Sequence, residues 1–525
     1  MEDLINELLH KVDLPALVPQ LSWHKLCEEF MYRPEAPMLF SSGLFMFLFI
    51  AFLAIYIPLR KHLTARLIYV VLFSVFFYYK SSGLWFVLLL CTATSDFIIG
   101  RRLSLTVSRP VRKLLVAVSL CVNLGMLAYF KYFNFIVDAF VRLGHEVGHL
   151  LGMTELEALA FEPADIFLPV GISFFTFQSL SYIIEIYRRR IDPVYRWIDY
   201  IFYVSFFPQL VAGPIVRARE FIPQIYRTPS LSRAHFGEGL FLIICGLIKK
   251  AVISDYISLN FVDRIFDAPL LYTGLENLIG VYGYALQIYC DFSGYSDMAI
   301  GLALLLGFRF SMNFDSPYCS ASITEFWRRW HISLSSWLRD YLYISLGGNR
   351  KGRLRTYVNL LLTMLLGGLW HGASMRFILW GGIHGVALAV DKFLMGRFRK
   401  SRREGAKLNP VRRLAGILIT FHVVCFGWIF FRADSMQTTW DILNRIALDF
   451  HPEILPQFVE GYKTVVALML AGYLFHFMPR RVEGLMQSIV TRSPLLVQAI
   501  ILVAVIFVIV QMKSAGVQPF IYFQF

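Results

Sequence analysis

Residues 324–335 of this 525-residue chain read TEFWRRWHISLS, and residues 367–372 read GGLWHG. Between the two motifs lie a basic turn, residues 349–355, and an apolar run. The first motif places a glutamate, two arginines and a histidine among bulky apolar side chains. Ionisable groups are costly inside a membrane, so in a largely apolar chain they indicate a functional site. The two motifs therefore point to chemistry inside a membrane protein.

The composition supports this class of protein. Hydrophobic residues make up 57% of the chain, charged residues make up 16%, and the mean hydropathy is +0.58. Soluble domains carry about 25% charged residues. At about 20 residues per span, the chain has room for about a dozen spans and for no sizeable soluble domain. The net charge of +14 is explained by basic residues in cytoplasmic loops and by their attraction to anionic lipid. We therefore expect no nucleic-acid partner.

The chain divides into a lead-in, residues 1–37, and a membrane domain, residues 38–525. Apolar residues of the lead-in recur at helical spacing, at Leu4, Leu8, Leu9 and Val12. This spacing predicts an amphipathic helix lying on the membrane, with a partly disordered tail as the alternative. We expect no cleavable signal peptide, because the first apolar run begins near Met38 and lacks a small-residue cleavage site.

The hydropathy pattern predicts an all-α, polytopic fold with about 11–14 transmembrane or re-entrant helices. The apolar segments are residues 38–58, 66–79, 82–99, 112–141, 166–187, 197–213, 236–260, 271–291, 293–310, 356–371, 375–395, 412–432, 462–478 and 494–513. Segment 197–213 has basic flanks on both sides, so we expect a re-entrant hairpin there. We extend this interpretation to residues 318–346.

Loop charges predict the orientation of the chain. Basic clusters are expected to face the cytoplasm; they lie at residues 101–113, 188–196, 217–233, 349–355, 397–413 and 480–492. The loops at 146–165 and 434–460 and the C-terminus are then expected on the other side. The sequence has no evident internal repeat, which argues against a secondary transporter.

His371 lies between Trp370 and Gly372. If the run before it is helical, a rise of about 1.5 Å per residue puts His371 about 20 Å from the basic turn, well inside a bilayer core about 30 Å thick. An imidazole there can accept a proton from an attacking hydroxyl, which is the task of a general base. The alternative, a hydrogen-bonded core histidine, is weakened by the flanking glycines, because they let a ligand or backbone approach closely.

His331 is the second candidate. The charges around it are too many for a lipid-facing helix, so they are expected to line a water-filled cavity or to pair with one another. Glu325 precedes Arg328 by three residues and Arg329 by four, a spacing that suits an ion pair on one helical face. In the functional interpretation, Arg328 and Arg329 bind a phosphate-bearing ligand and His331 assists the chemistry. The alternative is a salt-bridged helix at the membrane interface.

A third polar break in the apolar sequence is residues 291–297, DFSGYSD. Asp291 and Asp297 could bind a cation, or the segment could hinge two half-helices; we favour the helix break. His384, His422 and His476 stand alone on apolar faces and are expected to be structural. We expect no metal site, because ligands at zinc spacing and CxxC pairs are missing from the sequence. P-loop and Rossmann fingerprints are missing as well.

Several of these motifs resemble the membrane-bound O-acyltransferase family, and in particular its alginate O-acetylase branch. The similar segments are WRRWHISLS (327–335), LGGNR (346–350), GGLWHG (367–372), LPVGISFFTFQ (168–178), FPQLVAGPI (207–215), GLIKK (246–250) and PFIYFQF (519–525). The resemblance runs from about residue 38 to the end of the chain, and the lead-in departs from the pattern.

The resemblance implies helices around a central tunnel, through which an acyl group from a cytoplasmic donor reaches an acceptor on the far side. It implies that His371 is the catalytic residue, as general base or transient acyl carrier, and His331 its polar partner. We assign donor binding to Arg328 and Arg329. Glu325, Trp370, Asp291 and Asp297 are assigned tunnel or structural polar roles.

The implied donor is acetyl-coenzyme A, without a bound cofactor. The implied acceptor is an exported polysaccharide such as alginate, reached through a periplasmic or membrane-attached acetyltransferase partner. The expected location is the bacterial inner membrane, and membrane lipid is an expected partner. Two alternatives stay open: transfer of D-alanine or another acyl group, and a polysaccharide or solute channel that performs no acyl transfer.

Overall fold

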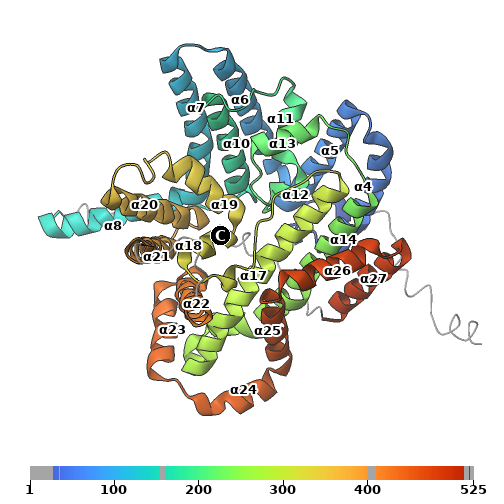
Figure 1. Ribbon diagram of the computed structural model, residues 1–525. Coiled ribbons are helices and arrows are strands. Elements are labelled where there is room, and N and C mark those ends of the chain that lie inside the picture. Colours follow the sequence, from blue (N-terminus) through green and yellow to red (C-terminus); the bar gives the residue numbers. More distant parts are fainter. Residues whose placement is uncertain (1–27, 35, 154–159, 400–408, 513–519, 521–525) are drawn as a thin grey trace, which may run out of the picture.

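The computed structural model describes residues 28–34, 36–153, 160–399, 409–512 and 520 (Figure 1). Within these ranges every regular element is a helix, which confirms the all-α prediction. The amphipathic helix predicted for the start of the lead-in lies outside the described residues.

Five helical stretches of the described chain are long and apolar enough to cross a membrane. They are Leu63–Leu105, Arg109–Leu151, Met375–Leu394, Pro410–Arg432 and Leu495–Met512. A sixth is counted if Pro452–Gly461 and Lys463–His476, which bend by 97° against each other, form one broken span. The protein is therefore a multi-pass membrane protein. The predicted 11–14 helices also included shorter and re-entrant segments, and α4 (Gly43–Leu59) is one of the shorter ones.

Helix α17 (Gly274–Leu305) runs through the middle of the molecule as one continuous helix of 32 residues (Figure 1). The prediction of two segments with a break at residues 291–297 was wrong. The helix stays continuous, and its two carboxylates form ion pairs: Asp291 with Lys250 and Asp297 with Lys249, each at 2.6 Å. Both lysines belong to η3 (Ile248–Ser254), a π-helix that continues α14 (Arg233–Leu247). Charges can stay inside a helix bundle where they are paired or hydrogen-bonded.

The two segments predicted to be re-entrant consist of short helices. Residues 197–213 contain α11 (Trp197–Ser205) and α12 (Phe207–Leu210), of nine and four residues. All residues from 199 to 218 are buried. Residues 318–346 contain α18 (Ile323–Arg329), α19 (Ile332–Trp337) and the π-helix η7 (Leu338–Tyr343). None of these five helices is long enough to cross a bilayer alone.

Helices α20 (Arg353–His371) and α21 (Met375–Arg399) form a hairpin that places His371 at its tight end. Glycines let the two backbones touch. A Cβ atom on Gly368 would clash with the carbonyl oxygen of Phe377, and one on Gly381 would clash with that of Met364. Gly382, the next residue, has space: a Cβ there would meet only a Leu365 methyl group, at 3.6 Å.

We therefore expect Gly381→Ala to destabilise the protein by about 1–3 kcal/mol, the usual cost of overpacking a tight contact. Gly382→Ala is the matched control in the same helix and should leave stability within about 0.5 kcal/mol. Thermal unfolding of both purified variants in one detergent tests this. Equal melting temperatures for the two variants would contradict the close backbone packing.

Candidate functional site

His371 is the last residue of α20, and its side chain is buried with 4% of its surface exposed. The backbone leaves the helix at Gly372, which is extended, and α21 begins three residues later at Met375. Three aromatic rings pack edge-on against the imidazole: Trp370 and Trp380 at 5.0 Å and Phe431 at 5.2 Å between ring centroids. The imidazole is thus held at a helix end, within an aromatic surrounding.

The carbonyl groups at the end of α20 accept hydrogen bonds from a helical stretch that lies far away in the sequence. The Lys131 ammonium donates hydrogen bonds to the carbonyl oxygens of Trp370 at 2.9 Å and His371 at 2.8 Å. The Tyr132 hydroxyl donates to the carbonyl oxygen of Leu369 at 2.8 Å. Lys131 and Tyr132 lie in η2 (Ala128–Tyr132), a π-helix that joins α7 (Arg109–Leu127) to α8 (Phe133–Leu151). The last carbonyls of a helix have no partner within the helix, and a cation there also interacts favourably with the helix dipole.

His371 lines a small cavity of about 40 Å³ together with Lys131, Trp370, Val211 and residues 168–174. Residues 168–174 belong to the LPVGISF segment and lead into α10 (Ile172–Tyr187). Gly171 has a φ of 77°, and a Cβ there would clash with the backbone at Leu210 and Val211. Only glycine allows this left-handed turn to press against α12. Three of the motifs that resemble the acyltransferase family therefore meet at His371.

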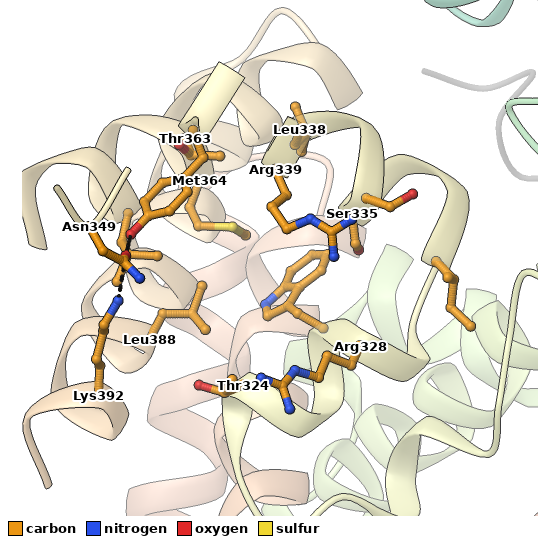
Figure 2. Close-up of a pocket in the computed structure, with 15 residues that line it drawn as sticks. Thr324, Arg328, Ser335, Leu338, Arg339, Asn349, Thr363, Met364, Leu388 and Lys392 are labelled. Carbon is orange, nitrogen blue, oxygen red and sulfur yellow. Dashed lines mark hydrogen bonds between the residues drawn. The ribbon is translucent and has the colours of Figure 1, made fainter. Parts of the chain in front are cut away.

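A larger cavity of about 370 Å³ lies beside α18, α19, η7, α20 and α21. Figure 2 shows Arg328 and Arg339 on one side of this cavity and Lys392 on the other. None of its 15 lining residues is acidic. Lys392 donates a hydrogen bond to Asn349 at 2.9 Å, and Arg339 forms an ion pair with Asp340 at 2.7 Å. The cavity is therefore suited to an anionic ligand.

Asp340 lies just outside this cavity and neutralises part of its charge. Burial raises the pKa of the Asp340 carboxyl, but hydrogen bonds from Arg339 and Arg217 outweigh that effect and hold the pKa below its usual value. Asp340 is thus ionised at neutral pH and compensates Arg339 and Arg217. Arg328 has no ion pair or hydrogen bond from its guanidinium within the described ranges.

An aromatic contact connects the larger cavity to His371. Trp327 lines that cavity, and its ring lies 5.7 Å from the ring of Trp380, which contacts His371. His384, predicted to be structural, packs against the same two tryptophans at 5.2 and 4.9 Å. His371 thus lines the small cavity, while two indole rings separate it from the larger one. The central tunnel implied by the resemblance stays a prediction.

His331 is fully buried and adopts a left-handed backbone conformation, with φ 42° and ψ 57°. Its Nδ1 lies 3.2 Å from Asn313 Oδ1, which also accepts a hydrogen bond from the backbone N–H of Ser333 at 3.1 Å. Because Asn313 Oδ1 is an acceptor, Nδ1 carries the proton and Nε2 the lone pair of a neutral ring. The His331 ring lies 6.4 Å from Trp370, so both candidate histidines contact the same indole.

The arginines predicted to bind a ligand have different surroundings. Arg329 forms an ion pair with Glu325 at 2.8 Å, the i,i+4 pair that the spacing predicted, and approaches Asp315 at 4.0 Å. Arg328 is exposed and lines the larger cavity. The structure therefore places Arg328 where a ligand could reach it and gives Arg329 a local ion pair. Within the described residues, no group of three or more His, Cys, Asp and Glu side chains could hold a metal ion.

Comparison with known proteins identifies the family. The sequence profile of MBOAT, the membrane-bound O-acyltransferase family, matches residues 165–428, which include every residue of the site except Lys131, Tyr132 and Phe431. The chain belongs to this family. It is therefore an O-acyltransferase.

Individual relatives cover most of the chain. A probable alginate O-acetylase AlgI of Pseudomonas aeruginosa is 42% identical over 408 residues, 77% of this chain and 74% of its own length. A second, from Pseudomonas putida, is 37% identical over 515 residues, 93% of this chain and all of its own length. A peptidoglycan O-acetyltransferase of Helicobacter pylori is 34% identical over 437 residues, 78% of this chain and 79% of its own length.

The sequence analysis missed Lys131, Tyr132, Trp380 and Asn313. Lys131 was included in an apolar segment, residues 112–141, where a lone lysine with an adjacent tyrosine is itself the signal of a buried polar contact. Its partners lie about 240 residues further along the chain. Sequence spacing contains no information about such a contact.

We expect Lys131→Met to loosen the end of α20, because the carbonyl groups of Trp370 and His371 lose a charged donor. Such a hydrogen bond contributes about 1.5–3 kcal/mol, so amide exchange at residues 369–374 should become roughly 10- to 100-fold faster. Hydrogen–deuterium exchange with mass spectrometry measures this. Lys113→Met, at an exposed position of α7, is the matched control; unchanged exchange in Lys131→Met would contradict the proposed contact.

Proposed function

We propose that this protein transfers acetyl groups from cytoplasmic acetyl-coenzyme A towards an exported polysaccharide, in the inner membrane of a bacterium. The observation that carries the proposal is the position of His371, between a basic cavity and a second cavity lined by family motifs. The relatives are named as probable alginate O-acetylases and a peptidoglycan O-acetyltransferase. These names favour acetyl as the transferred group and a glycan as the final acceptor.

The basic cavity supports a donor that carries phosphate groups. Arg328 and Lys392 lie on opposite sides of a volume of about 370 Å³, so a phosphate there would lie between positive charges. A guanidinium with free donors binds phosphate in a bidentate manner. The basic turn at residues 349–355, predicted to face the cytoplasm, contributes Asn349 to the same cavity.

His371 then carries the chemistry. With its ring as general base, it takes the proton of the attacking hydroxyl while the hydroxyl oxygen bonds to the thioester carbonyl carbon. The carbon–sulfur bond breaks, and the coenzyme A sulfur leaves and takes up a proton. His331 lies on the same indole as His371 and serves as its polar partner. On the outer side, the acceptor hydroxyl belongs to a periplasmic or membrane-attached acetyltransferase that completes the transfer to the polysaccharide.

Replacing His371 by Ala should lower thioester cleavage and acetyl transfer by about 10²- to 10⁴-fold, the usual contribution of a general base. The assay uses radiolabelled acetyl-coenzyme A and purified protein in proteoliposomes. His422→Ala is the control, because His422 is exposed and bonds to Tyr282. Full transfer by His371→Ala would refute the assignment. Solute flux without thioester cleavage in the unaltered protein would instead indicate a channel.

Arg328→Gln should raise the KM for acetyl-coenzyme A about tenfold, because one charged contact to phosphate of about 1.5 kcal/mol is lost. Its melting temperature should not change, since the side chain has no partner in the described protein. Arg329→Gln should lower the melting temperature, because it breaks the pair with Glu325. Arg350→Gln, exposed in the basic turn and outside the cavity lining, is the control for KM. An unchanged KM in Arg328→Gln would remove Arg328 from donor binding.

A further inference from the structure

A third cavity, of about 700 Å³, lies away from the site, between the ends of four helices. Its walls come from the C-terminal end of α4, the N-terminal end of α14, the C-terminal end of α17 and the N-terminal end of α27 (Leu495–Met512). In Figure 1, α4, α14 and α27 lie together on one side of the molecule, and α26 (Arg480–Arg492) packs on α14 there. Ile57 and Leu495, which line the cavity, are exposed, so the cavity is open to the surroundings of the helix bundle.

Two kinds of side chain line this cavity. One part is apolar and includes Leu53, Ile57, Leu304 and Leu495; the other carries Arg60, Arg233 and His235. No carboxylate lines it, and neither arginine forms an ion pair within the described ranges. The guanidinium of Arg233 donates to the carbonyl oxygens of Arg492 at 3.3 Å and Ser493 at 3.1 Å, which hold it in place without neutralising it.

His235 adds no charge of its own but connects a third arginine. Its Nδ1 lies 3.0 Å from the carbonyl oxygen of Ser230, so Nδ1 carries the proton. Its Nε2 lies 2.6 Å from Arg309 Nη2 and accepts a hydrogen bond from it. The ring is therefore neutral. Two guanidinium groups, those of Arg60 and Arg233, thus line the polar end of the cavity, and that of Arg309 bonds to the His235 ring that lines it.

We propose that this cavity binds one anionic phospholipid of the cytoplasmic leaflet, with its phosphate between Arg60 and Arg233 and an acyl chain along the apolar wall. Charge complementarity supports this occupant, because the polar end carries only positive charge and the rest is apolar. The location also supports it: the polar end borders residues 217–233 and 480–492, two of the basic clusters predicted to face the cytoplasm. Basic pockets between membrane helices on that side bind anionic headgroups.

The lipid would contribute to the packing of the last helix. Within α27, only Gln498 is buried, and it bonds back to Val490 and Ser493 at the end of α26. Ile57 of α4 and Leu495 of α27 lie on the same cavity wall. An acyl chain between them would bury apolar surface of both helices, which would otherwise be in contact only with bulk lipid.

Native mass spectrometry of the full-length protein, purified in mild detergent with phosphatidylglycerol or with phosphatidylcholine of the same chain length, tests the proposal. We expect one phosphatidylglycerol to stay bound at detergent levels that remove phosphatidylcholine. The double variant Arg60→Gln/Arg233→Gln should reduce the bound fraction at least tenfold, because a charged contact is lost at each position. The control double variant Arg102→Gln/Arg109→Gln removes two exposed arginines of another predicted cytoplasmic cluster and should bind as the unaltered protein does.

A second variant tests the apolar wall without changing charge. Ile57 is 49% exposed, so Ile57→Trp can fold and fill the cavity; it should lose phosphatidylglycerol while both arginines remain. Unchanged binding in the Arg60/Arg233 variant, equal retention of phosphatidylcholine, or unchanged binding in Ile57→Trp would each overturn the proposal. Inorganic phosphate that raises the melting temperature as much as phosphatidylglycerol does would also overturn it, because the site would then bind the anion alone.

Discussion

The carbonyl groups at the end of α20 need hydrogen-bond donors from outside the helix, and this requirement organises the site. The helix ends inside the protein, where water cannot serve every carbonyl, so donors must come from another helix. Lys131 and Tyr132 supply them from a π-helix, a local widening of the helix that brings neighbouring side chains to one face. Without this contact, the residue that carries the imidazole would lie on a frayed helix end.

The same rule explains the other charges inside the bundle. Lys249 and Lys250 reach two carboxylates of α17 from a second π-helix, and Arg329 pairs with Glu325 along one face of α18. Each charge has a partner at 2.6–2.8 Å, which is what allows helices with polar sequences to remain continuous in an apolar environment. Arg328 differs from these residues because it lines a cavity and has no ion pair within the described ranges.

The sequence was informative where the contacts are local. The i,i+4 spacing predicted the pair of Glu325 with Arg329, which the structure contains; the catalytic role of His371 stays a prediction. The family motifs supplied the fold. Prediction failed where a partner lies far along the chain: the DFSGYSD segment was read as a helix break because it interrupts apolar sequence, and its lysine partners lie more than 40 residues away. Lys131 was missed for the same reason. The separation of the cavities by Trp327 and Trp380 could not be inferred, since it depends on how three helices pack.

The indole layer has a consequence for the membrane itself. Energised membranes store energy as an ion gradient, and a membrane enzyme with an open aqueous path through it would dissipate such a gradient. Trp327 and Trp380 lie in contact with each other and with neighbouring rings, so apolar aromatic surface lies between the larger cavity and His371 at this point. Close aromatic packing beside the imidazole therefore limits the leakage of water and ions along this path, while His371 still lines the small cavity.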